Sequence, residues 1–377
     1  MTKGDSKVTV PCVPFSKIVG QDRAIRLLRE AMARERMPHA YLFVGIPGVG
    51  KTTAALALCQ ALNCENPLNG EGCGRCPCCR KMTGGNFPDL VIVEPDGQAT
   101  KIEQVRALDR IFSFKPVAGK YRLTLIRQAE TMSEEAANAF LKTLEEPPPG
   151  NLLVLNVSEP LDLLPTILSR CQRVSFRPLP AALIETWLME NRGMEREKAR
   201  VTARMAAGSL GKALDMGQGD FLEKRQDLLF NVSRIMHRAP EEMVEWVLAY
   251  GVQERKEKKE EAVALLLGIW KTWYRDLLCV KSMCPEESLV NIDFSRELKN
   301  AAGDFTIDNL LESFFILDQA ERDMMRFRNL DLLIQTALLK LKSLHGRARK
   351  TTGHGTGRTF PHGGGGSAAQ VRQSPEF

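Results

Sequence analysis

The sequence predicts an α/β phosphate-binding domain with a cysteine-rich insertion, then a small helical lid and an all-α C-terminal region. Short apolar runs alternate with helix-like patterns in the first half of the chain, which is typical of a parallel sheet covered by helices. A phosphate-loop motif follows the first apolar run, at residues 45–52. Residues 219–345 are almost entirely helical in their periodicity. The chain has 377 residues, which is enough for two or three domains.

The phosphate-loop motif reads Gly-Ile-Pro-Gly-Val-Gly-Lys-Thr and matches G-x-x-x-x-G-K-S/T. An apolar run at 41–44 predicts a buried strand before it, and residues 53–58 predict a helix after it. Glycines let the backbone N–H groups face an anion, and the helix N-terminus adds partial positive charge. Lys51 is expected to reach the β- and γ-phosphates of ATP or ADP, and Thr52 to hold Mg²⁺. The predicted nucleotide-binding residues of this segment are Gly45, Pro47, Gly48, Val49, Gly50, Lys51, Thr52 and Thr53.

A second part of the nucleotide site is predicted upstream, where residues 15–21 precede a helical pattern over 24–32. Ile18 and Val19 could pack against an adenine ring, and they could equally belong to an ordinary core. We include Val19 among the predicted nucleotide-binding residues. For the loop itself, the alternative is a glycine-rich strand-to-helix turn that binds no ligand.

Five of the ten cysteines lie between Cys64 and Cys79. Clustering of this kind favours a metal site over disulfides in a reducing compartment. Cys64, Cys73, Cys76 and Cys79 are separated by eight, two and two residues, and four thiolates at such spacings can close a tetrahedral site for a structural Zn²⁺ ion. Cys78 is a fifth thiol that leaves the register open. The alternative is a reduced loop without metal.

Further strands are predicted at 87–95, 122–126, 152–157 and 174–176, with helices over 102–112 and after Ser133, up to residue 146. An ATPase of this architecture usually carries, after the third strand, an Asp for Mg²⁺ and a Glu that polarises water. Here Arg127 and Gln128 occupy those places. A guanidinium cannot ligate Mg²⁺, and we expect Glu130, further along, to face another way. These letters argue against ATP hydrolysis by this chain.

The net charge of +6 is weak support for a DNA-binding face. Residues 346–377 hold five Lys or Arg and one Glu, so they contribute +4 and leave +2 for the rest. This Gly-rich segment is predicted to be a disordered tail. The longest apolar run, 262–270, is too short to span a bilayer, and the N-terminus has no secretory apolar core. We therefore expect a cytoplasmic protein with no membrane partner.

Several segments together resemble the bacterial clamp-loader subunits, which are AAA+ proteins of the DNA polymerase III holoenzyme. They are residues 19–21, the phosphate loop, the four-cysteine knuckle, residues 138–147 and Ser169-Arg170-Cys171. The resemblance runs from about residue 14 to 215, with a weaker echo at 329–332. It implies an AAA+ domain over 1–178 with a zinc knuckle at 64–79, a lid over 179–217, an oligomerisation collar over 218–345 and the tail. The implied partners are tau/gamma and delta subunits in a hetero-pentamer, the sliding clamp, and primed DNA through the complex.

Within this family the pattern resembles the delta prime class. The motor subunits, tau and gamma, keep the Asp-Glu pair and an Arg in the lid, whereas this chain has Arg127, Gln128 and Gly211. The resemblance implies that Arg170 is an arginine finger acting in trans on a neighbour's ATP, although a lone Arg is by default a surface ion pair. The chain would then be a non-catalytic subunit of a DNA-directed DNA polymerase (nucleotidyltransferase) holoenzyme. The alternatives are an active motor ATPase and an unrelated nucleic-acid-binding zinc protein.

Overall fold

The computed structural model describes residues 13–97, 99–235, 242, 245, 256–324 and 329–352. The chain divides into two compact units, and the division falls after Glu223. The first unit holds the sheet, the phosphate loop, the cysteine cluster and three lid helices, and the second is helical.

The first unit is built on a five-stranded parallel sheet with the strand order β2-β3-β4-β1-β5. Tyr41 of β1 pairs with Val154 of β4 on one side and with Gln172 of β5 on the other. Parallel strands buried on both faces read as continuous apolar runs, which is why the strands were recognisable in the sequence. The bounds are β1 Ala40–Val44, β2 Leu90–Val93, β3 Arg122–Ile126, β4 Asn151–Val157 and β5 Gln172–Ser175.

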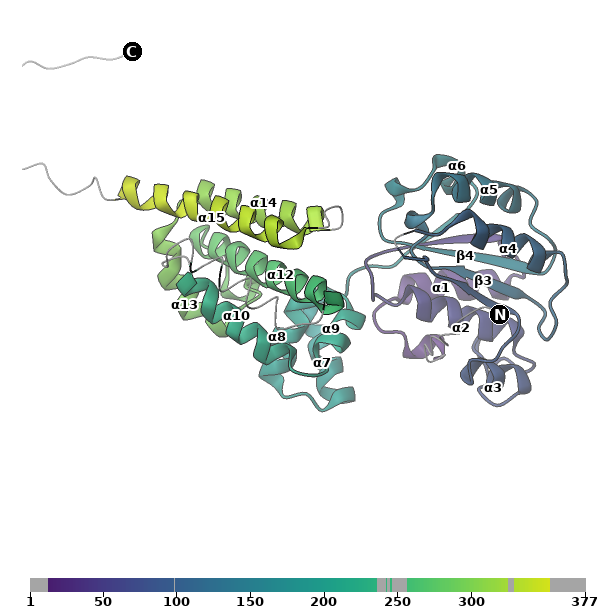
Figure 1. Cartoon of the computed structure of the whole chain (residues 1–377). Helices are drawn as coiled ribbons and strands as arrows, with labels where there is room; N and C mark the ends of the chain where they lie inside the picture. The colour runs from purple at the N-terminus through teal and green to yellow at the C-terminus, as the bar shows by residue number, and fades with distance from the viewer. Residues whose placement is uncertain are drawn as a thin grey trace, which may run out of the picture. The chain divides into compact units, whose positions relative to one another are not determined.

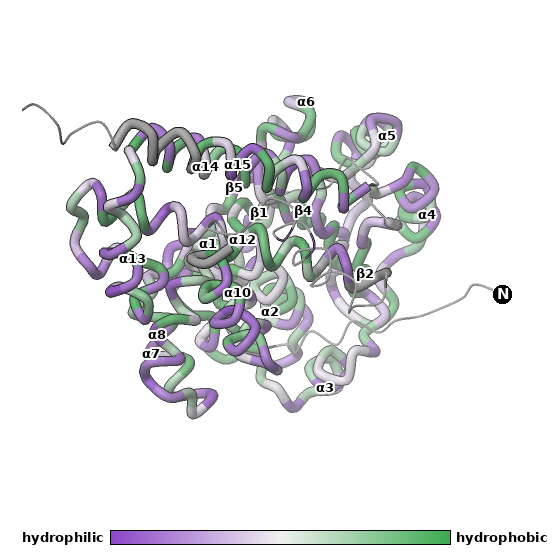
Figure 2. Tube along the Cα trace, turned by 60° about the vertical axis from the view of Figure 1, so that its left-hand side comes forward, coloured by the Kyte–Doolittle hydropathy of each residue, from purple (hydrophilic) through white to green (hydrophobic). Residues whose placement is uncertain are grey.

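Helices cover both faces of the sheet (Figure 1). Alternate residues of β1 enter two different cores, with Tyr41 and Phe43 in one and Leu42 in the other. Helices such as α4 and α5 carry both hydrophobic and hydrophilic positions, as expected for helices with one buried side (Figure 2). One face carries α1 Asp22–Ala33, α2 Lys51–Asn63 and α3 Pro77–Thr83, and the other carries α4 Ile102–Phe112, α5 Glu134–Glu145 and α6 Pro165–Leu168.

The α/β architecture predicted from the sequence is confirmed, and several of its elements agree to the residue. The strand predicted at 122–126 and the helix predicted at 102–112 have those bounds. Helix α5 begins after Ser133, whose side chain accepts a hydrogen bond from the N–H of Ala136 at 3.2 Å, as an N-cap does. Three short 3-10 turns complete this part: η1 Phe15–Lys17, η2 Ala129–Thr131 and η3 Pro160–Asp162.

Three lid helices follow the sheet in the first unit: α7 Ala181–Arg192, α8 Arg196–Met205 and α9 Leu210–Met216. They share a small core that includes Ile184, Leu188 and Ala203. The N–H of Leu179 donates to the carbonyl of Gly208 at 2.9 Å, which ties the segment after β5 to the turn before α9. This tie brings the start of α9 to the phosphate loop, where the N–H of Gly211 reaches the carbonyl of Gly48.

The second unit is helical, as the sequence predicts. Helix α12 packs against α13 and α14, and α14 packs against α15. Trp270 and Trp273 of α12 are buried in this core. The bounds are α10 Phe221–Ile235, α12 Lys256–Lys281, α13 Ser295–Ala301, α14 Ile307–Met324 and α15 Leu330–Thr352, with η4 Glu286–Ser288, η5 Ile292–Phe294 and η6 Ala302–Asp304 between α12 and α14.

Helix α15 runs to Thr352 and so passes the boundary at residue 345 where the sequence predicts the tail to begin. The rest of that predicted tail, 353–377, lies outside the described residues, as do residues 1–12. Among the described helices, none combines the length and the apolar character needed to cross a bilayer.

Candidate functional site

The phosphate loop connects the end of β1 to α2 at the carboxyl edge of the sheet. Gly48 and Gly50 have φ values of 73° and 110°, a left-handed conformation that side chains disfavour. Gly50 is the N-cap of α2, so the positive end of that helix faces the loop. A cavity of about 740 Å³ opens beside it. Both the backbone N–H groups and the helix end make this cavity suited to an anion.

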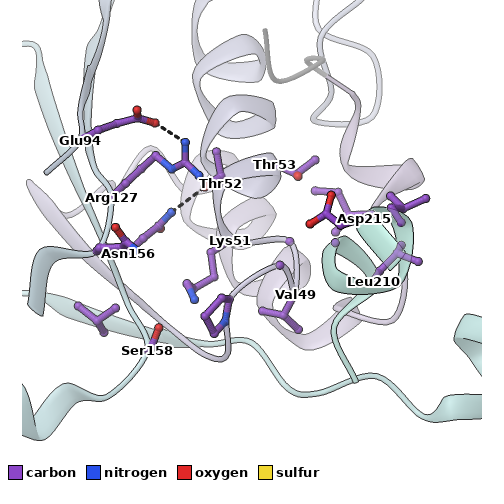
Figure 3. Close-up of a pocket in the computed structure, with 18 of the residues that line it drawn as sticks. Val49, Lys51, Thr52, Thr53, Glu94, Arg127, Asn156, Ser158, Leu210 and Asp215 are labelled. Atoms are coloured by element: carbon purple, nitrogen blue, oxygen red, sulfur yellow. Dashed lines mark hydrogen bonds and ion pairs between the residues drawn. The ribbon is translucent and has the colours of Figure 1, made fainter. Parts of the chain in front are cut away.

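Nearly all the predicted nucleotide-binding residues line this cavity. Gly45 is the exception, because its N–H donates to the carbonyl of Val157 at 3.1 Å and it belongs to the strand end. Figure 3 shows Leu210 and Asp215 of α9 on one side of the site and Glu94, Arg127, Asn156 and Ser158 on the other. The predicted residues on the lining are Val19, Pro47, Gly48, Val49, Gly50, Lys51, Thr52 and Thr53.

One end of the cavity is apolar. Ile18 and Val19 line it together with Leu179, Leu210 and Leu214. Ile18 is buried, and Val19 packs against the lid core. The sequence left two roles open for Ile18 and Val19, core packing and contact with an adenine ring. In the structure both residues pack against a hydrophobic core and also line the cavity. The wall is of the kind that a flat aromatic base covers.

Lys51 is held inside the cavity. Its ammonium group donates to the carbonyl oxygens of Gly45 and Ile46, the latter at 3.0 Å. Burial lowers the pKa of Lys51 to about 8, and the carboxylate of Glu130 acts in the opposite direction. A phosphate group in the loop would offer this ammonium a charged partner in place of carbonyl dipoles.

Glu130 lines the same cavity, so the expectation that it faces another way is wrong. Gln128 adopts a left-handed conformation with φ 50°, which turns the chain back directly after β3. The turn brings Glu130 over the strand ends, where one carboxylate oxygen accepts from the N–H of Ser158 at 3.0 Å. A positive φ at a glutamine carries no signal in the sequence.

The expected magnesium position is occupied by other groups. The hydroxyl of Thr52 accepts a hydrogen bond from the side-chain amide of Asn156 at 3.1 Å. The guanidinium of Arg127, at the end of β3, forms an ion pair with Glu94 beside it (Figure 3). Mg²⁺ prefers oxygen ligands and a guanidinium offers only N–H donors, so Arg127 cannot serve as the ligand expected after β3, although Glu130 keeps a carboxylate in the same cavity.

Asn156 and Glu94 were not among the predicted site residues. Both are polar residues at the carboxyl ends of apolar strands, where ligands of parallel sheets gather. Their position at the strand ends was the sequence signal that could have identified them. Gln21 belongs to the 19–21 segment of the family resemblance and was not among the predicted site residues. Its buried side chain donates to the carbonyl of Arg177 at 2.8 Å and accepts from the N–H of Arg177 at 3.1 Å. It thereby joins the segment before α1 to the end of the sheet.

The lid touches the phosphate loop through two glycines. The N–H of Gly211, at the start of α9, donates to the carbonyl of Gly48 at 2.8 Å. A Cβ atom at Gly211 would lie 2.8 Å from the Cα of Gly48, which is too close for any side chain. In this arrangement only glycine fits at position 211. The family resemblance places an arginine there in the motor subunits.

The four predicted metal ligands come together in the segment before β2. The sulfurs of Cys64, Cys73, Cys76 and Cys79 all lie within 4.8 Å of one another. Tetrahedral Zn–S bonds of about 2.3 Å place sulfurs about 3.8 Å apart, and the Sγ atoms of Cys64 and Cys76 are separated by 4.0 Å. Cys78 is outside this group, and its thiol faces the carbonyl of Ala118 at 3.8 Å. The four-sulfur set fits a closed, structural Zn²⁺ ion.

Backbone N–H groups point at these sulfurs. The N–H of Cys73 lies 3.2 Å from the Sγ of Cys64, and the N–H of Cys76 lies 3.3 Å from the Sγ of Cys73. The N–H groups of Arg75 and Cys76 lower the pKa of Cys73 to about 6, whereas burial raises the pKa of Cys64 and Cys79. Since metal ligation requires thiolates, a bound cation would keep the buried sulfurs ionised.

The knuckle is joined to the nucleotide site through Glu71. Its carboxylate accepts from the N–H of Ser16 at 2.7 Å and from its hydroxyl at 3.0 Å, and it forms an ion pair with Arg29. The Arg29 guanidinium lies 5.8 Å from the centre of the Phe15 ring. These contacts hold η1, which directly precedes the apolar wall at residues 18–19.

Arg170 lies apart from this cavity. It follows α6, and its guanidinium donates to a carboxylate oxygen of Glu145 at 2.7 Å and to the carbonyl of Thr166 at 3.1 Å. Its side chain is 35% exposed. Among the described cavity-lining residues, Arg170 does not occur. Its hydrogen-bond partners in the described structure are Glu145, Thr166 and the hydroxyl of Ser169.

Comparison with known proteins places these features in one family. Residues 20–180 match the family described as "DNA polymerase III, delta subunit". DNA polymerase III subunit delta' of Bacillus subtilis (strain 168) is 31% identical over 326 residues, which cover 85% of this chain and 96% of that protein. The chain belongs to the family of DNA polymerase III clamp-loader subunits.

A motor-type relative matches a smaller share of its own length. DNA polymerase III subunit tau of Escherichia coli (strain K12) is 36% identical over 207 residues, which cover 54% of this chain and 32% of that protein. A solved structure, a DNA polymerase III gamma subunit-related protein of Thermotoga maritima, is 19% identical with a TM-score of 0.41 and covers 85% of this chain and 99% of that one.

Proposed function

We propose that this clamp-loader subunit is of the delta prime type and assists ATP hydrolysis without performing it. The observation that carries the proposal is Arg127, which pairs with Glu94, lines the same cavity as Thr52 and follows β3 where a hydrolysing site carries an Mg²⁺ ligand. Gln128, the next residue, offers an amide where a motor would present a carboxylate. With Arg127 in place of the Asp ligand and Gln128 in place of the Glu that orients water, the site can hold a nucleotide but is poorly equipped to cleave it, although the Glu130 carboxylate lines the same cavity.

The assistance would come from Arg170. A finger must be exposed, charged and held in one direction, and Arg170 is half-exposed and oriented by Glu145 and Thr166. Arg donors stabilise the charge that spreads over the phosphoryl oxygens in the transition state. The neighbouring subunit would supply the nucleotide, the metal ion and the attacking water.

In this proposal the phosphate loop still binds ATP or ADP. The loop geometry, Lys51, the helix N-terminus and the apolar wall at residues 18–19 are all present in one cavity. The zinc knuckle and Glu71 would brace that wall. The described part of the second unit, a bundle of α10 and α12–α15, would serve as the collar for tau/gamma and delta subunits in a hetero-pentamer that loads the sliding clamp on primed DNA.

The rival function is that of an active motor subunit of the tau/gamma type. The intact phosphate loop and the identity to the Escherichia coli tau subunit favour it. Against it stand Arg127, Gln128 and the contact between Gly211 and Gly48, which leaves no room for a lid arginine. The delta' relative from Bacillus subtilis also spans most of both chains, whereas the tau match covers 32% of its partner.

Reconstitution tests the proposal. The chain is mixed with the cognate tau/gamma-type and delta-type subunits, and the assembly is analysed by size-exclusion chromatography with light scattering and by a clamp-loading assay. We expect a complex with one copy of this chain, and loading that is lost when the chain is omitted. Complete assembly and loading without it would contradict the proposed role.

A further inference from the structure

We infer that this phosphate loop binds a nucleoside di- or triphosphate without a divalent cation, and that the guanidinium of Arg127 supplies the positive charge that a metal ion would otherwise supply. The inference rests on the proposed nucleotide binding and concerns how the phosphates are neutralised. It begins from the mismatch between the usual metal site and the side chains present.

The first observation is the position of Arg127. Figure 3 shows its side chain reaching from the end of β3 towards Thr52, with the guanidinium between Thr52 and the carboxylate of Glu94. The ion pair with Glu94 holds it there. The backbone is fixed as well, because the N–H of Arg127 donates to the carbonyl of Val93 at 2.9 Å. A permanent cation therefore stands next to the hydroxyl that would otherwise ligate Mg²⁺.

The second observation is that Thr52 already has a partner. Its hydroxyl oxygen accepts from the amide of Asn156 at 3.1 Å. A metal ion in the usual place would compete with Asn156 for the lone pairs of this oxygen, and it would also meet the positive charge of Arg127. Both effects disfavour the ion, and neither hinders a phosphate oxygen, which accepts readily from guanidinium and amide N–H groups.

The third observation is the balance of charge. The described cavity lining has three cationic side chains, Lys17, Lys51 and Arg127, and three carboxylates, Glu94, Glu130 and Asp215. The formal sum is zero, to which the loop N–H groups and the α2 dipole add favourable potential. Replacing Arg127 by Asp would make the sum −2, and phosphates would then need a metal ion to enter.

The experiment measures ADP and ATP binding by isothermal titration calorimetry, once with EDTA and once with MgCl₂. For the natural chain we expect dissociation constants that differ by less than about threefold between the two conditions. Arg127→Asp is expected to lose at least about tenfold in affinity in EDTA and to recover when Mg²⁺ is added, because a carboxylate replaces the fixed cation. Arg127→Lys, which keeps the charge, is expected to remain independent of Mg²⁺.

The matched control is Lys101→Ala. Lys101 forms an exposed ion pair with Asp96 at 2.6 Å just beyond β2, and it does not line the cavity. Its loss should leave both dissociation constants unchanged, and thermal melting of each variant verifies folding. Binding by the natural chain that is at least about tenfold tighter with Mg²⁺ would overturn the inference, since the metal would then fit. Absence of binding in both conditions would also overturn it, while reconstitution separately tests the clamp-loader role.

Discussion

Arg170→Ala should leave the chain folded and able to join the complex, and in the proposed finger role it should slow ATP cleavage at the neighbouring subunit's site by about a thousandfold. The side chain is 35% exposed, and its removal costs the fold only the ion pair with Glu145 and the hydrogen bonds to Thr166 and Ser169, which are near the surface and contribute little. In the proposed role, the variant removes charge that would otherwise stabilise the neighbour's transition state. The measurement is steady-state ATP turnover of the reconstituted complex with clamp and primed DNA. The total rate should fall by the fraction of turnover that this one site contributes.

Two variants separate the finger from a general loss of surface charge. Arg170→Lys keeps the charge but not the planar fork of donors, and an intermediate rate is expected. Arg34→Ala removes an arginine that pairs with Glu30 on α1 at 3.8 Å, and it should have no effect. An unchanged turnover in Arg170→Ala, with the complex intact, would rule out the finger.

Cys79→Ser should cause the largest loss of stability. Cys79 is fully buried and is one of the four grouped sulfurs. Replacing it would remove one ligand of the proposed Zn²⁺ ion, and the knuckle would lose the cross-link that this ion provides. We expect metal analysis to fall from about one zinc per chain to a small fraction, and the free energy of unfolding to drop by about 4 kcal/mol or more.

Cys78→Ser is the matched control, because Cys78 is adjacent, buried and outside the four-sulfur group. It should retain zinc and lose little stability. Loss of zinc in Cys78→Ser together with retention in Cys79→Ser would show that Cys78, and not Cys79, is the fourth ligand. Chelation of the natural protein should reproduce the Cys79→Ser melting curve.

Much of the sheet could be predicted from the sequence because its signals are local. A parallel strand such as 122–126 is buried on both faces, so its residues form one apolar run. Helix α4 repeats apolar residues at helical spacing, and Ser133 marks the start of α5 by its own hydrogen bond. The phosphate loop and the cysteine spacing are also contiguous motifs, which is why nearly all their residues were found together in the structure.

The details that decide the chemistry are not local. Glu130 enters the cavity because Gln128 adopts a left-handed backbone conformation. A glutamine in the sequence does not predict that conformation. The contact between Gly211 and Gly48 joins positions far apart in the chain. Nothing in the sequence indicates that Glu71, within the knuckle, accepts hydrogen bonds from Ser16. Each of these depends on tertiary packing, which propensity and spacing do not encode.

The central claim, that this chain binds nucleotide and assists hydrolysis but does not perform it, is tested most directly on the purified protein alone. ATP turnover is measured in parallel with binding, for the natural chain and for Lys51→Ala as the control for contaminating activity. We expect saturable binding that Lys51→Ala weakens, and turnover no greater than in that variant. Sustained turnover that Lys51→Ala abolishes would contradict the claim and would make the chain a motor subunit in spite of Arg127 and Gln128.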